Sequence, residues 1–403
     1  MTLSEELTWR GFYNQTTFTT PETLDTEKFT LYLGTDPSAD SLHVGHLAVY
    51  MMVRRFLDRG HKVVLLVGGG TGVIGDPSGK SDERNLIGLE EIGRNKTALA
   101  NQVSTLFSGK QFALVDNYDW LHKVSILDFL RDAGKHFGMS TLVQRDYIAT
   151  RIGEGGSGMS FAEFSYTLLQ GYDYWHLFKS HGVNLQIGGS DQWGNILSGV
   201  DLIRKKETAT VHGMTAPLVI NKATGKKFGK SEAGAVWLDE AKTSVYKFYQ
   251  FWLNVDDESA IDYLKLFTLL SREEIDDLAK LTAQNPAERE AQKVLAHEVT
   301  KLVHGEGRAQ QARNVTAALF GGTPFSQLLS EELDMLAAEI PVTAGSHVID
   351  ALVSSGVAGS KGEARRLIDG SAVSVNGEKV TEDIELPVPS LIKKGKNNFI
   401  LVR

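Results

Sequence analysis

Short apolar segments alternate with a helical pattern in the first part of the chain. Residues 29–33 and 62–67 are apolar or β-rich, and a glycine follows each, as expected of strands that end in turns. Between them, residues 47–57 repeat apolar side chains at helical spacing and stop before Gly60, which suits a C-terminal helix cap. A strand, a helix and a strand in this order predict a right-handed crossover and a parallel sheet. Residues 184–188 are a further candidate strand.

The pattern changes twice in the second half of the chain. Residues 245–325 are predicted to be mainly helical, and Ser271 with Glu274 forms a capping-box signature. From Pro341 onward, residues 360–370 are expected to form a capped helix. Residues 372–380 are expected to form two strands around an Asn-Gly turn. The chain is therefore expected to contain an α/β domain, a helical domain and a small α+β domain.

Composition narrows the class of protein. The 403 residues include 42 Lys and Arg, 50 Asp and Glu and no Cys, and the net charge is −8. Without cysteine there is no disulfide framework, thiolate zinc site, iron–sulfur ligation or cysteine nucleophile. No apolar run is long enough for a transmembrane helix, and the first residues lack the pattern of a secretory leader. We therefore expect a cytoplasmic protein without a membrane partner. The acidic balance alone argues against a nucleic-acid partner.

Three glycine-rich segments match known phosphate-binding motifs only in part. Gly70-x-Gly72-x-x-Gly75 follows a predicted strand, but Asp76-Pro77 interrupts the helix that a dinucleotide site requires. Two segments, ending at Lys80-Ser81 and Lys230-Ser231, are each one residue short of the Walker A spacing. We interpret all three as turn-rich loops, whose lysines remain available to phosphate in another geometry.

His43 and His46 lie at the predicted start of the helix that follows the first strand. Their spacing places both rings on one face of the opening turn, where free backbone N–H groups favour anions. Imidazole donors at this position suit the charge that develops on a transferring phosphoryl group. Gly45 leaves room for a flat ligand. A zinc site is disfavoured because no third ligand is evident nearby.

Three other segments carry candidate chemistry. Residues 226–231, Lys-Lys-Phe-Gly-Lys-Ser, form a cationic glycine-containing loop able to follow pyrophosphate. Ser160 with Glu163 is a second capping-box signature, and the helix that follows aligns three polar side chains on one face: Tyr166, Gln170 and Asp173. Residues 188–195, Gly-Gly-Ser-Asp-Gln-Trp-Gly-Asn, follow a predicted strand at the edge where open parallel sheets bind ligands.

Taken in order, these motifs resemble those of class I aminoacyl-tRNA synthetases. His43-Val-Gly-His46 and Lys227-Phe-Gly-Lys-Ser231 are similar to the two signatures of that class. The residues from Tyr32 to Asp36, from Ile74 to Ser78, from Tyr166 to Asp173 and from Gly188 to Gly194 narrow the resemblance to the bacterial tyrosyl-specific family over nearly the whole chain. The tail from residue 341 resembles an S4-type RNA-binding module. Leu33 departs from the pattern, since relatives often carry cysteine there.

The resemblance implies a fold and a two-step reaction. The fold is a Rossmann-like parallel-sheet catalytic domain followed by an α-helical domain and a small S4-like domain. Tyrosine and Mg²⁺-bound ATP would form tyrosyl-adenylate and pyrophosphate, and the tyrosyl group would pass to the 3′-terminal ribose of tRNA(Tyr). No zinc, other protein-held metal or prosthetic group is implied.

The resemblance also assigns residues to each role. Charge neutralisation at the phosphates falls to His43, His46, Lys227, Lys230 and Ser231, with Lys80 and Arg84 as further basic candidates. Tyrosine would be bound by Tyr32, Asp76, Tyr166, Gln170, Asp173 and Gln192. ATP would contact Gly34, Asp36, His43, Gly45, His46, Asp191 and Lys230.

The expected macromolecular partners are tRNA(Tyr) and a second copy of the chain. Phosphate contacts are expected from three basic clusters: Arg204, Lys205 and Lys206; Arg365 and Arg366; and Lys393, Lys394 and Lys396. The acidity is concentrated in residues 256–290, away from these clusters, so the net charge does not exclude RNA. By analogy with the family, the surface of a homodimer would include residues 117–137.

The expected domains are 1–232, catalytic and including the Lys227–Ser231 loop; 233–325, helical and on the anticodon side; 326–340, a linker; and 341–403, S4-like. Two alternatives remain open. One is a synthetase-like RNA-binding protein that has lost catalysis, which the intact His43, His46, Lys227 and Lys230 argue against. The other is a tryptophan-specific relative, which the pairing of Tyr32 with Asp173 disfavours.

Overall fold

The computed structural model describes residues 1–403 except 79–86, 221–224, 226–227, 229, 232–233 and 322. The chain forms two compact units. The first contains residues 1–243 and 254–295, and the second contains residues 244–253 and 296–403.

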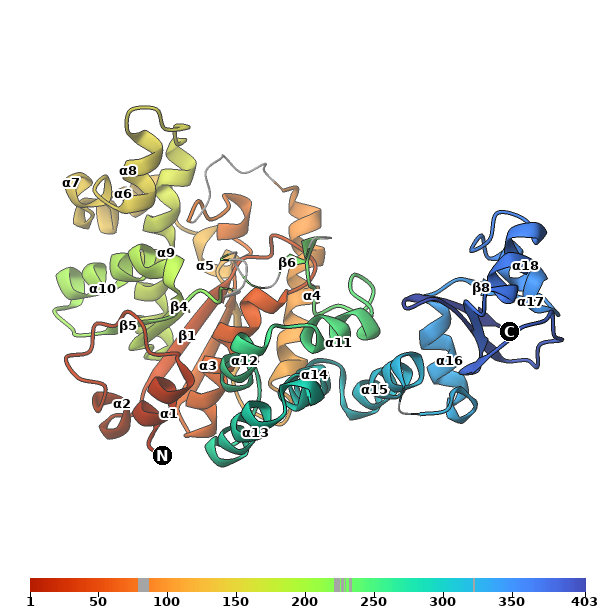
Figure 1. The fold of residues 1–403 in the computed structure, drawn as a ribbon. Coiled ribbons are helices and arrows are strands. Elements are labelled where there is room, and N and C mark those ends of the chain that lie inside the picture. Colours follow the sequence, from red (N-terminus) through yellow and green to blue (C-terminus); the bar gives the residue numbers. More distant parts are fainter. Residues whose placement is uncertain (79–86, 221–224, 226–227, 229, 232–233, 322) are drawn as a thin grey trace. The chain divides into compact units, whose positions relative to one another are not determined.

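The first unit is built on a parallel sheet of five strands in the order β3-β2-β1-β4-β5. Helices α3, α9 and α10 pack close to this sheet (Figure 1). The strands are β1 (Thr30–Thr35), β2 (Lys62–Val67), β3 (Ala113–Asp116), β4 (Leu185–Gly189) and β5 (His212–Ala216). The three predicted strands, their parallel pairing and the predicted helix are therefore confirmed, and β3 and β5 are additions.

The other elements of the first unit connect these strands or follow them. Its helices are α1 (Leu3–Arg10), α2 (Thr23–Thr26), α3 (Val44–Asp58), α4 (Leu89–Leu106), α5 (Tyr118–Leu121), α6 (Ile126–Asp132), α7 (Met139–Leu142), α8 (Asp146–Ile152), α9 (Phe161–His181), α10 (Trp193–Glu207), α12 (Asp257–Phe267) and α13 (Arg272–Gln284). A short hairpin is formed by β6 (Lys230–Ser231) and β7 (Gly234–Ala235).

The core on one side of the sheet is aromatic and aliphatic. Tyr32, Val64 and Leu66 from the strands pack with Tyr174 of α9 and Ile203 of α10. Val64 of β2 lies directly opposite Tyr32 of β1, and because side chains alternate along a strand, Leu66 lies on the same face as Val64. The packing holds α9 and α10 against the sheet, and α9 carries the polar stripe identified in the sequence.

The second unit combines helices with a small mixed sheet. Its helices are α11 (Val245–Leu253), α15 (Glu306–Phe320), α16 (Ser330–Ala337), α17 (Val348–Ser354) and α18 (Lys361–Asp369), and α14 (Glu290–His304) runs from the first unit into it. The sheet order is β10-β9-β11-β12-β8, from β8 (Val342–Thr343), β9 (Val373–Val375), β10 (Glu378–Lys379), β11 (Ser390–Lys394) and β12 (Asn398–Val402).

The turn predicted in this sheet is present. β9 and β10 pair antiparallel around Asn376 and Gly377, whose φ angles are 49° and 93°. Positive φ at both central residues is what a type I′ hairpin turn requires, and Asn-Gly supplies it with little strain. The predicted capped helix is also confirmed, since the Ser360 side chain accepts a hydrogen bond from the Glu363 amide at the start of α18.

Candidate active site

The predicted site residues converge at the carboxyl edge of the five-stranded sheet. Asp36 follows β1, Gly68 to Gly70 follow β2, and Asp191 follows β4. β1 pairs with β2 on one side and with β4 on the other, so the connections diverge there. In open parallel sheets, a crevice for ligands forms at such a point.

His43 and His46 cap the start of α3 with their own side chains. The Gly45 amide donates to Nδ1 of His43 at 3.0 Å, and the His43 amide donates to Nδ1 of His46 at 3.2 Å. The two rings stack with centroids 3.9 Å apart. Since both Nδ1 atoms accept a backbone N–H, the neutral form of either ring carries its proton on Nε2.

His46 stays neutral throughout the physiological range of pH. Burial and the neighbouring His43 imidazole lower the pKa of His46 to about 3. The neutral ring carries no full charge at the amino end of α3, where the helix dipole is positive.

Gly45 leaves space for the ring of His43. A Cβ at this position would lie 2.8 Å from Cε1 and 3.0 Å from Nδ1 of His43. Those distances are shorter than real Cβ contacts, so a side chain here would displace the imidazole. The sequence predicted that Gly45 makes room for a ligand; in this structure the nearest atoms belong to the capping histidine.

Asp173 is buried and accepts two hydrogen bonds. Nδ2 of Asn117 and Nε1 of Trp120 each donate to its carboxylate at 2.8 Å. The Asp173 side chain is only 2 % exposed. Burial raises the pKa of Asp173 to about 7, against the opposing effect of these two donors and with a further increase from nearby carboxylates.

The Tyr32 hydroxyl is buried close to this carboxylate. Tyr32 is 1 % exposed, and its hydroxyl has no hydrogen-bond partner within the described part of the chain. Burial and the charge of Asp173 raise the pKa of Tyr32, which keeps the hydroxyl protonated. A buried hydroxyl without a partner is costly, and a polar ligand atom would offset that cost.

A chain of hydrogen bonds runs from Asp173 to the end of β1. Asn117 also donates to the Thr71 hydroxyl at 2.9 Å, and Thr71 donates to Asp36 at 2.6 Å. The Tyr166 hydroxyl donates to the other Asp36 oxygen at 2.8 Å. Burial, followed by the charges of Asp36 and Asp76, raises the pKa of Tyr166. The phenol therefore stays a donor, and Asp36 is held from two sides.

A second polar group surrounds Asp76. Nε2 of Gln192 donates to Asp76 at 2.6 Å, and the Ser78 amide donates to its other oxygen at 2.9 Å. Nδ2 of Asn195 bonds to Gln192 at 3.2 Å and to the Ser78 hydroxyl at 3.1 Å. The structure thus brings together Asp76 and Gln192, which are far apart in the sequence.

The other predicted substrate residues lie on the same elements. Gln170 is half-buried on α9 between Tyr166 and Asp173, and Gly34 is exposed within β1. The carboxylate of Asp191 folds over Gly189, where a Cβ would lie 2.7 Å from it.

Several predicted basic residues fall outside the described residues or have no described side chain. Lys80, Arg84 and Lys227 are in the first group. For Lys230 and Ser231 the structure describes the backbone, which forms β6.

One sequence prediction needs correction. Ser160 caps α9 as predicted, but the reciprocal half of the capping box is absent because the Glu163 carboxylate forms two 2.9 Å hydrogen bonds with Arg151 instead. Within residues 117–137, Asn117 is fully buried and the Trp120 indole donates to Asp173, whereas Ile126, Leu127 and Leu130 are exposed. Desolvation of Asp173 makes these inward donors favourable.

The first basic cluster is partly engaged within the protein. Lys205 donates to the His136 carbonyl and Lys206 to the Asp132 carbonyl, both at 2.6 Å. Lys206 also lies 4.3 Å above the Trp175 ring, and the exposed Arg204 pairs with Asp201 at 3.0 Å. These contacts order the segment after α6 against α10.

The clusters of the second unit are more exposed. Arg365, Arg366 and Lys396 face solvent. Lys393 lies 5.2 Å above the Phe399 ring, and Lys394 donates to the Val357 carbonyl at 2.9 Å.

Thr71, Asn117 and Trp120 also organise the site and were not predicted to lie in it, whereas Asn195 belongs to the predicted segment 188–195. Asn117 immediately follows β3, so the rule applied to the residues after β4 would have found it had residues 113–116 been recognised as a strand.

Neither a metal-binding cluster nor a membrane-spanning helix is found among the described residues. They contain no group of three or more His, Cys, Asp or Glu side chains placed to hold a metal ion. Among the helices they form, none is long and apolar enough to cross a membrane.

Comparisons with known proteins agree with this geometry. Residues 24–321 match the family model of tRNA synthetases class I (W and Y), and residues 332–403 match that of the tyrosine–tRNA ligase SYY-like C-terminal domain. The chain is 46% identical to tyrosine–tRNA ligase 2 of Bacillus cereus, with all of both chains covered. It is 44% identical to tyrosine–tRNA ligase 1 of Enterococcus faecalis, over 100% of this chain and 99% of the relative.

Solved structures show the same fold. A C-terminally truncated mitochondrial tyrosyl-tRNA synthetase of Aspergillus nidulans matches with a TM-score of 0.72 and 30% identity, covering 79% of this chain and 94% of that one. A tryptophanyl-tRNA synthetase of Encephalitozoon cuniculi matches with a TM-score of 0.55 and 14% identity, over 83% of this chain and 91% of that one, a likeness of fold alone. The chain belongs to the tRNA synthetases of class I (W and Y) and, within that family, to the tyrosine–tRNA ligases.

Proposed function

We propose that this ligase forms tyrosyl-adenylate at the carboxyl edge of β1, β2 and β4 and then transfers the tyrosyl group to the 3′-terminal ribose of tRNA(Tyr). The observation that carries the proposal is the buried Tyr32 hydroxyl, which has no partner among the described residues and lies close to Asp173. A substrate phenol would donate to the Asp173 carboxylate and accept from Tyr32. Phenylalanine would leave both groups unpaired.

The α-ammonium of tyrosine is proposed to lie nearer the end of β1. The carboxylate of Asp76 supplies negative charge there, and the Tyr166 hydroxyl and the Gln170 amide supply polar contacts. Gln192 holds Asp76 through its 2.6 Å hydrogen bond. Separate sites for phenol and ammonium fix the amino acid at both ends, which orients its carboxylate for reaction.

Adenylate formation requires alignment and charge stabilisation more than proton transfer. The tyrosine carboxylate is already ionised at pH 7 and attacks the α-phosphate, while pyrophosphate leaves with the Mg²⁺ that ATP brings as part of the substrate. We assign the Nε2–H groups of His43 and His46 to the phosphates as donors. The nucleotide would further contact Gly34, Asp36, Gly45 and Asp191. The cationic candidates for binding the pyrophosphate are Lys80, Arg84, Lys227 and Lys230. Ser231 is a further candidate as a hydroxyl donor.

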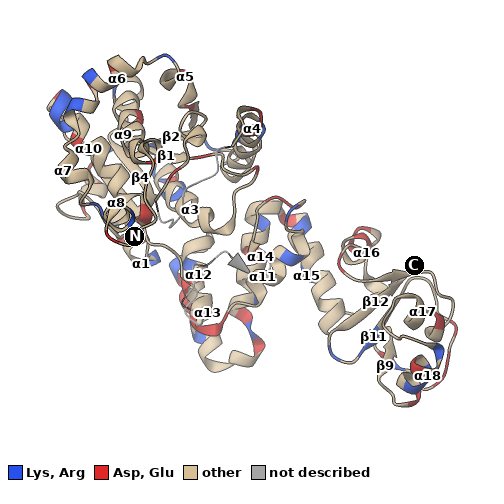
Figure 2. Ribbon diagram, turned by 90° about the horizontal axis from the view of Figure 1, so that it is seen from above, with Lys and Arg blue, Asp and Glu red and all other residues tan. Residues whose placement is uncertain are grey.

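The tRNA is proposed to contact basic residues of both units. Figure 2 shows Lys and Arg on α10 and α18, whereas acidic residues occupy much of α13. Arg204, Arg365 and Arg366 are exposed and suited to phosphate. Lys205, Lys206, Lys393, Lys394 and Lys396 complete the candidate set. Phosphate contacts of this kind predict charging that weakens as salt rises.

An exposed apolar surface supports the proposal of a homodimer. Leu127 is 75 % exposed on α6 and Phe161 is 76 % exposed at the start of α9. Other exposed apolar residues lie on α6, α7 and α8, helices that lie near α9 in Figure 1: Ile126, Leu130, Met139 and Ile152. A surface of this kind usually marks a protein interface, and a second copy of the chain is the occupant that we propose.

The dimer is tested by charge substitution. Leu127→Glu and Phe161→Glu are expected to give monomers in sedimentation experiments, while Leu329→Glu, at an equally exposed position of the second unit, should not. A dimer that survives both changes would contradict the proposed surface.

We further propose the division of labour along the chain: catalysis by 1–232, tRNA contact on the anticodon side by 233–325, a linker at 326–340 and RNA binding by 341–403. The cytoplasm, where ATP and tRNA are available, is the proposed location.

The phenol site is tested by Tyr32→Phe, which removes one hydroxyl and keeps the ring. In ATP–pyrophosphate exchange we expect the preference for tyrosine over phenylalanine to fall by about tenfold, the value of one hydrogen bond. An unchanged preference would mean that the phenol is recognised elsewhere.

A further inference from the structure

Phe228 lies within the second signature and packs against a helix far along the chain. Its side chain is 8 % exposed. Its ring centroid lies 4.2 Å from that of Tyr263 and 5.9 Å from that of Phe267, which are one turn apart on the same face of α12. The Phe228 amide donates to the Val219 carbonyl at 2.8 Å. The signature is therefore attached to α12 by an aromatic contact.

Phe228 also approaches the first signature. A Cβ at Gly45 would lie 3.8 Å from the Phe228 carbonyl oxygen, which is ordinary van der Waals contact. Val236, which follows the β6–β7 hairpin, also contacts the start of α3, since its carbonyl accepts from the Val44 amide at 2.9 Å. The two signatures thus meet at Phe228 and Gly45, between His43 and His46.

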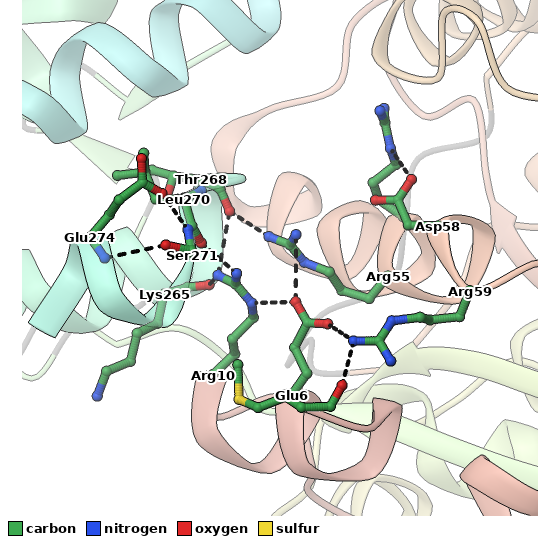
Figure 3. Close-up of polar contacts among 12 residues, drawn as sticks. Glu6, Arg10, Arg55, Asp58, Arg59, Lys265, Thr268, Leu270, Ser271 and Glu274 are labelled. Atoms are coloured by element: carbon green, nitrogen blue, oxygen red, sulfur yellow. Dashed lines mark hydrogen bonds and ion pairs between the residues drawn. The ribbon is translucent and has the colours of Figure 1, made fainter.

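The carboxyl end of α12 is held by two arginines from the amino-terminal part of the chain (Figure 3). Arg10 donates to the carbonyls of Lys265 at 2.8 Å and Leu270 at 2.7 Å. Arg55, in the last turn of α3, donates to the Thr268 carbonyl. Cationic donors are favourable at the end of a helix, where carbonyls lack partners.

A single carboxylate holds these arginines together. Glu6 accepts from Arg10 at 3.0 Å and from Arg59 at 3.0 Å, and it lies 3.7 Å from Arg55 (Figure 3). Burial lowers the pKa of Arg55 to about 10, with a further decrease from Arg10, so the guanidinium remains charged at pH 7. Because α3 begins immediately after His43, the network ties α12 to the helix that carries the first signature.

We propose that Phe228 is a positioning residue for adenylate formation: its ring, held on Tyr263 and Phe267, fixes the second signature against the start of α3. Lys227 precedes Phe228 and Lys230 follows it by two residues in the sequence, so Phe228 is the described side chain nearest to both lysines along the chain. This inference rests on the proposed contact of those lysines with pyrophosphate.

A change at Phe228 is expected to alter the kinetic constants for ATP and not those for tyrosine. The ring lies on α12, whereas the proposed tyrosine contacts come from β1, α9 and the turns after β2 and β4. Displacement of a reacting group by about 1 Å costs on the order of a hundredfold in rate. A change at Phe228 should therefore reduce adenylate formation and leave tyrosine binding intact.

The experiment measures ATP–pyrophosphate exchange by the full-length protein while ATP and tyrosine are varied separately. Phe228→Ala is expected to lower kcat/KM for ATP by about tenfold to a hundredfold, with KM for tyrosine within about twofold of wild type. Phe228→Met, which keeps an apolar side chain of similar length, should recover most of the loss. Phe112→Leu is the matched control, because Phe112 lies in another ring pair, with Phe107, before the amino end of β3.

A second measurement covers the case in which Phe228→Ala does not fold. A double-mutant cycle combines Phe228→Leu with Tyr263→Leu, and losses smaller than the product of the single effects support the contact. Additive losses, or Phe228→Ala kinetics like those of Phe112→Leu, would overturn the proposal. Lys230→Ala distinguishes a failure of the Phe228 proposal from a failure of the proposed lysine–pyrophosphate contact. If Lys230→Ala leaves exchange unchanged, the proposed function of the loop is wrong, whatever the effect of the Phe228 variants.

Discussion

The two hydrogen bonds that Asp173 accepts make a specific prediction about pH. The carboxylate must be ionised to accept the substrate phenol, and its pKa is raised to about 7 by burial. The wild-type kcat/KM for tyrosine should therefore rise as the pH increases through about 7. Trp120→Phe removes the indole donor, which lies 2.8 Å from the carboxylate, and keeps a ring stacked near His176.

The size of the change follows from the bond that is lost. A hydrogen bond to a charged group contributes about 1.5–3 kcal/mol, which corresponds to about one to two pH units. Loss of a donor to the carboxylate destabilises the ionised form, so the pKa of Asp173 moves further upward. The pH at which kcat/KM reaches half its maximum should shift from about 7 toward higher pH by that amount.

The assay is ATP–pyrophosphate exchange at limiting tyrosine, repeated from about pH 6 to 9 to cover the shifted pKa. Asp173→Asn is the control, because an amide does not titrate and its profile should lack the transition. His176 does not interfere, since burial lowers its pKa below its usual value. A Trp120→Phe profile with the wild-type midpoint would refute the assignment of the transition to Asp173.

The same group links stability to pH. Burial raises the pKa of Asp173 from its ordinary value of 3.8 to about 7, so between these values the native state holds a proton that the unfolded state has lost. This contribution is fully present below 3.8 and is lost as the pH rises through about 7. Between these values the free energy of unfolding should fall by up to about 1.4 kcal/mol per pH unit, and Asp173→Asn should remove that slope.

Three further predictions test the architecture. Glu163→Gln leaves Arg151 as an unpaired buried charge, and in urea unfolding it should cost about 3–5 kcal/mol; a loss below about 1 kcal/mol would mean that water or another group replaces the carboxylate. Gly69→Ala places a Cβ 2.4 Å from the Asp116 carboxylate, so tyrosine activation should fall sharply, and normal exchange would show that the turn relaxes. Deletion of 341–403 should spare exchange but weaken aminoacylation, and equal charging by the truncated protein would contradict an RNA-binding role for that tail.

Local patterns were sufficient for the elements that repeat a clear period. The buried strand at 62–67 was found within its exact bounds because a central parallel strand is apolar on both faces. The Asn376-Gly377 turn was found because its backbone demands residues that tolerate positive φ. β3 was not recognised because it has only four residues, lies at the edge of the sheet and exposes the side chain of Leu114.

Site residues that belong to a sequence motif were predicted, whereas residues placed in the site only by tertiary contacts were not. His43 and His46 were recognised by their spacing at a helix start, and the mutual capping that fixes both imidazole tautomers became visible only in the structure. Asn117 and Trp120 follow a strand that was not predicted, so nothing in the sequence placed their donors beside Asp173. The partner of Glu163 was also missed, because Arg151 lies beyond the reach of a local capping rule.

The central claim is that the site between β1, β2 and β4 activates tyrosine. ATP–pyrophosphate exchange with tyrosine, phenylalanine and tryptophan supplied separately tests it most directly. Rapid exchange is expected with tyrosine, far slower exchange with phenylalanine because Asp173 and Tyr32 would be left unpaired, and none above background with tryptophan. Exchange with no amino acid, or with tryptophan in preference to tyrosine, would contradict it.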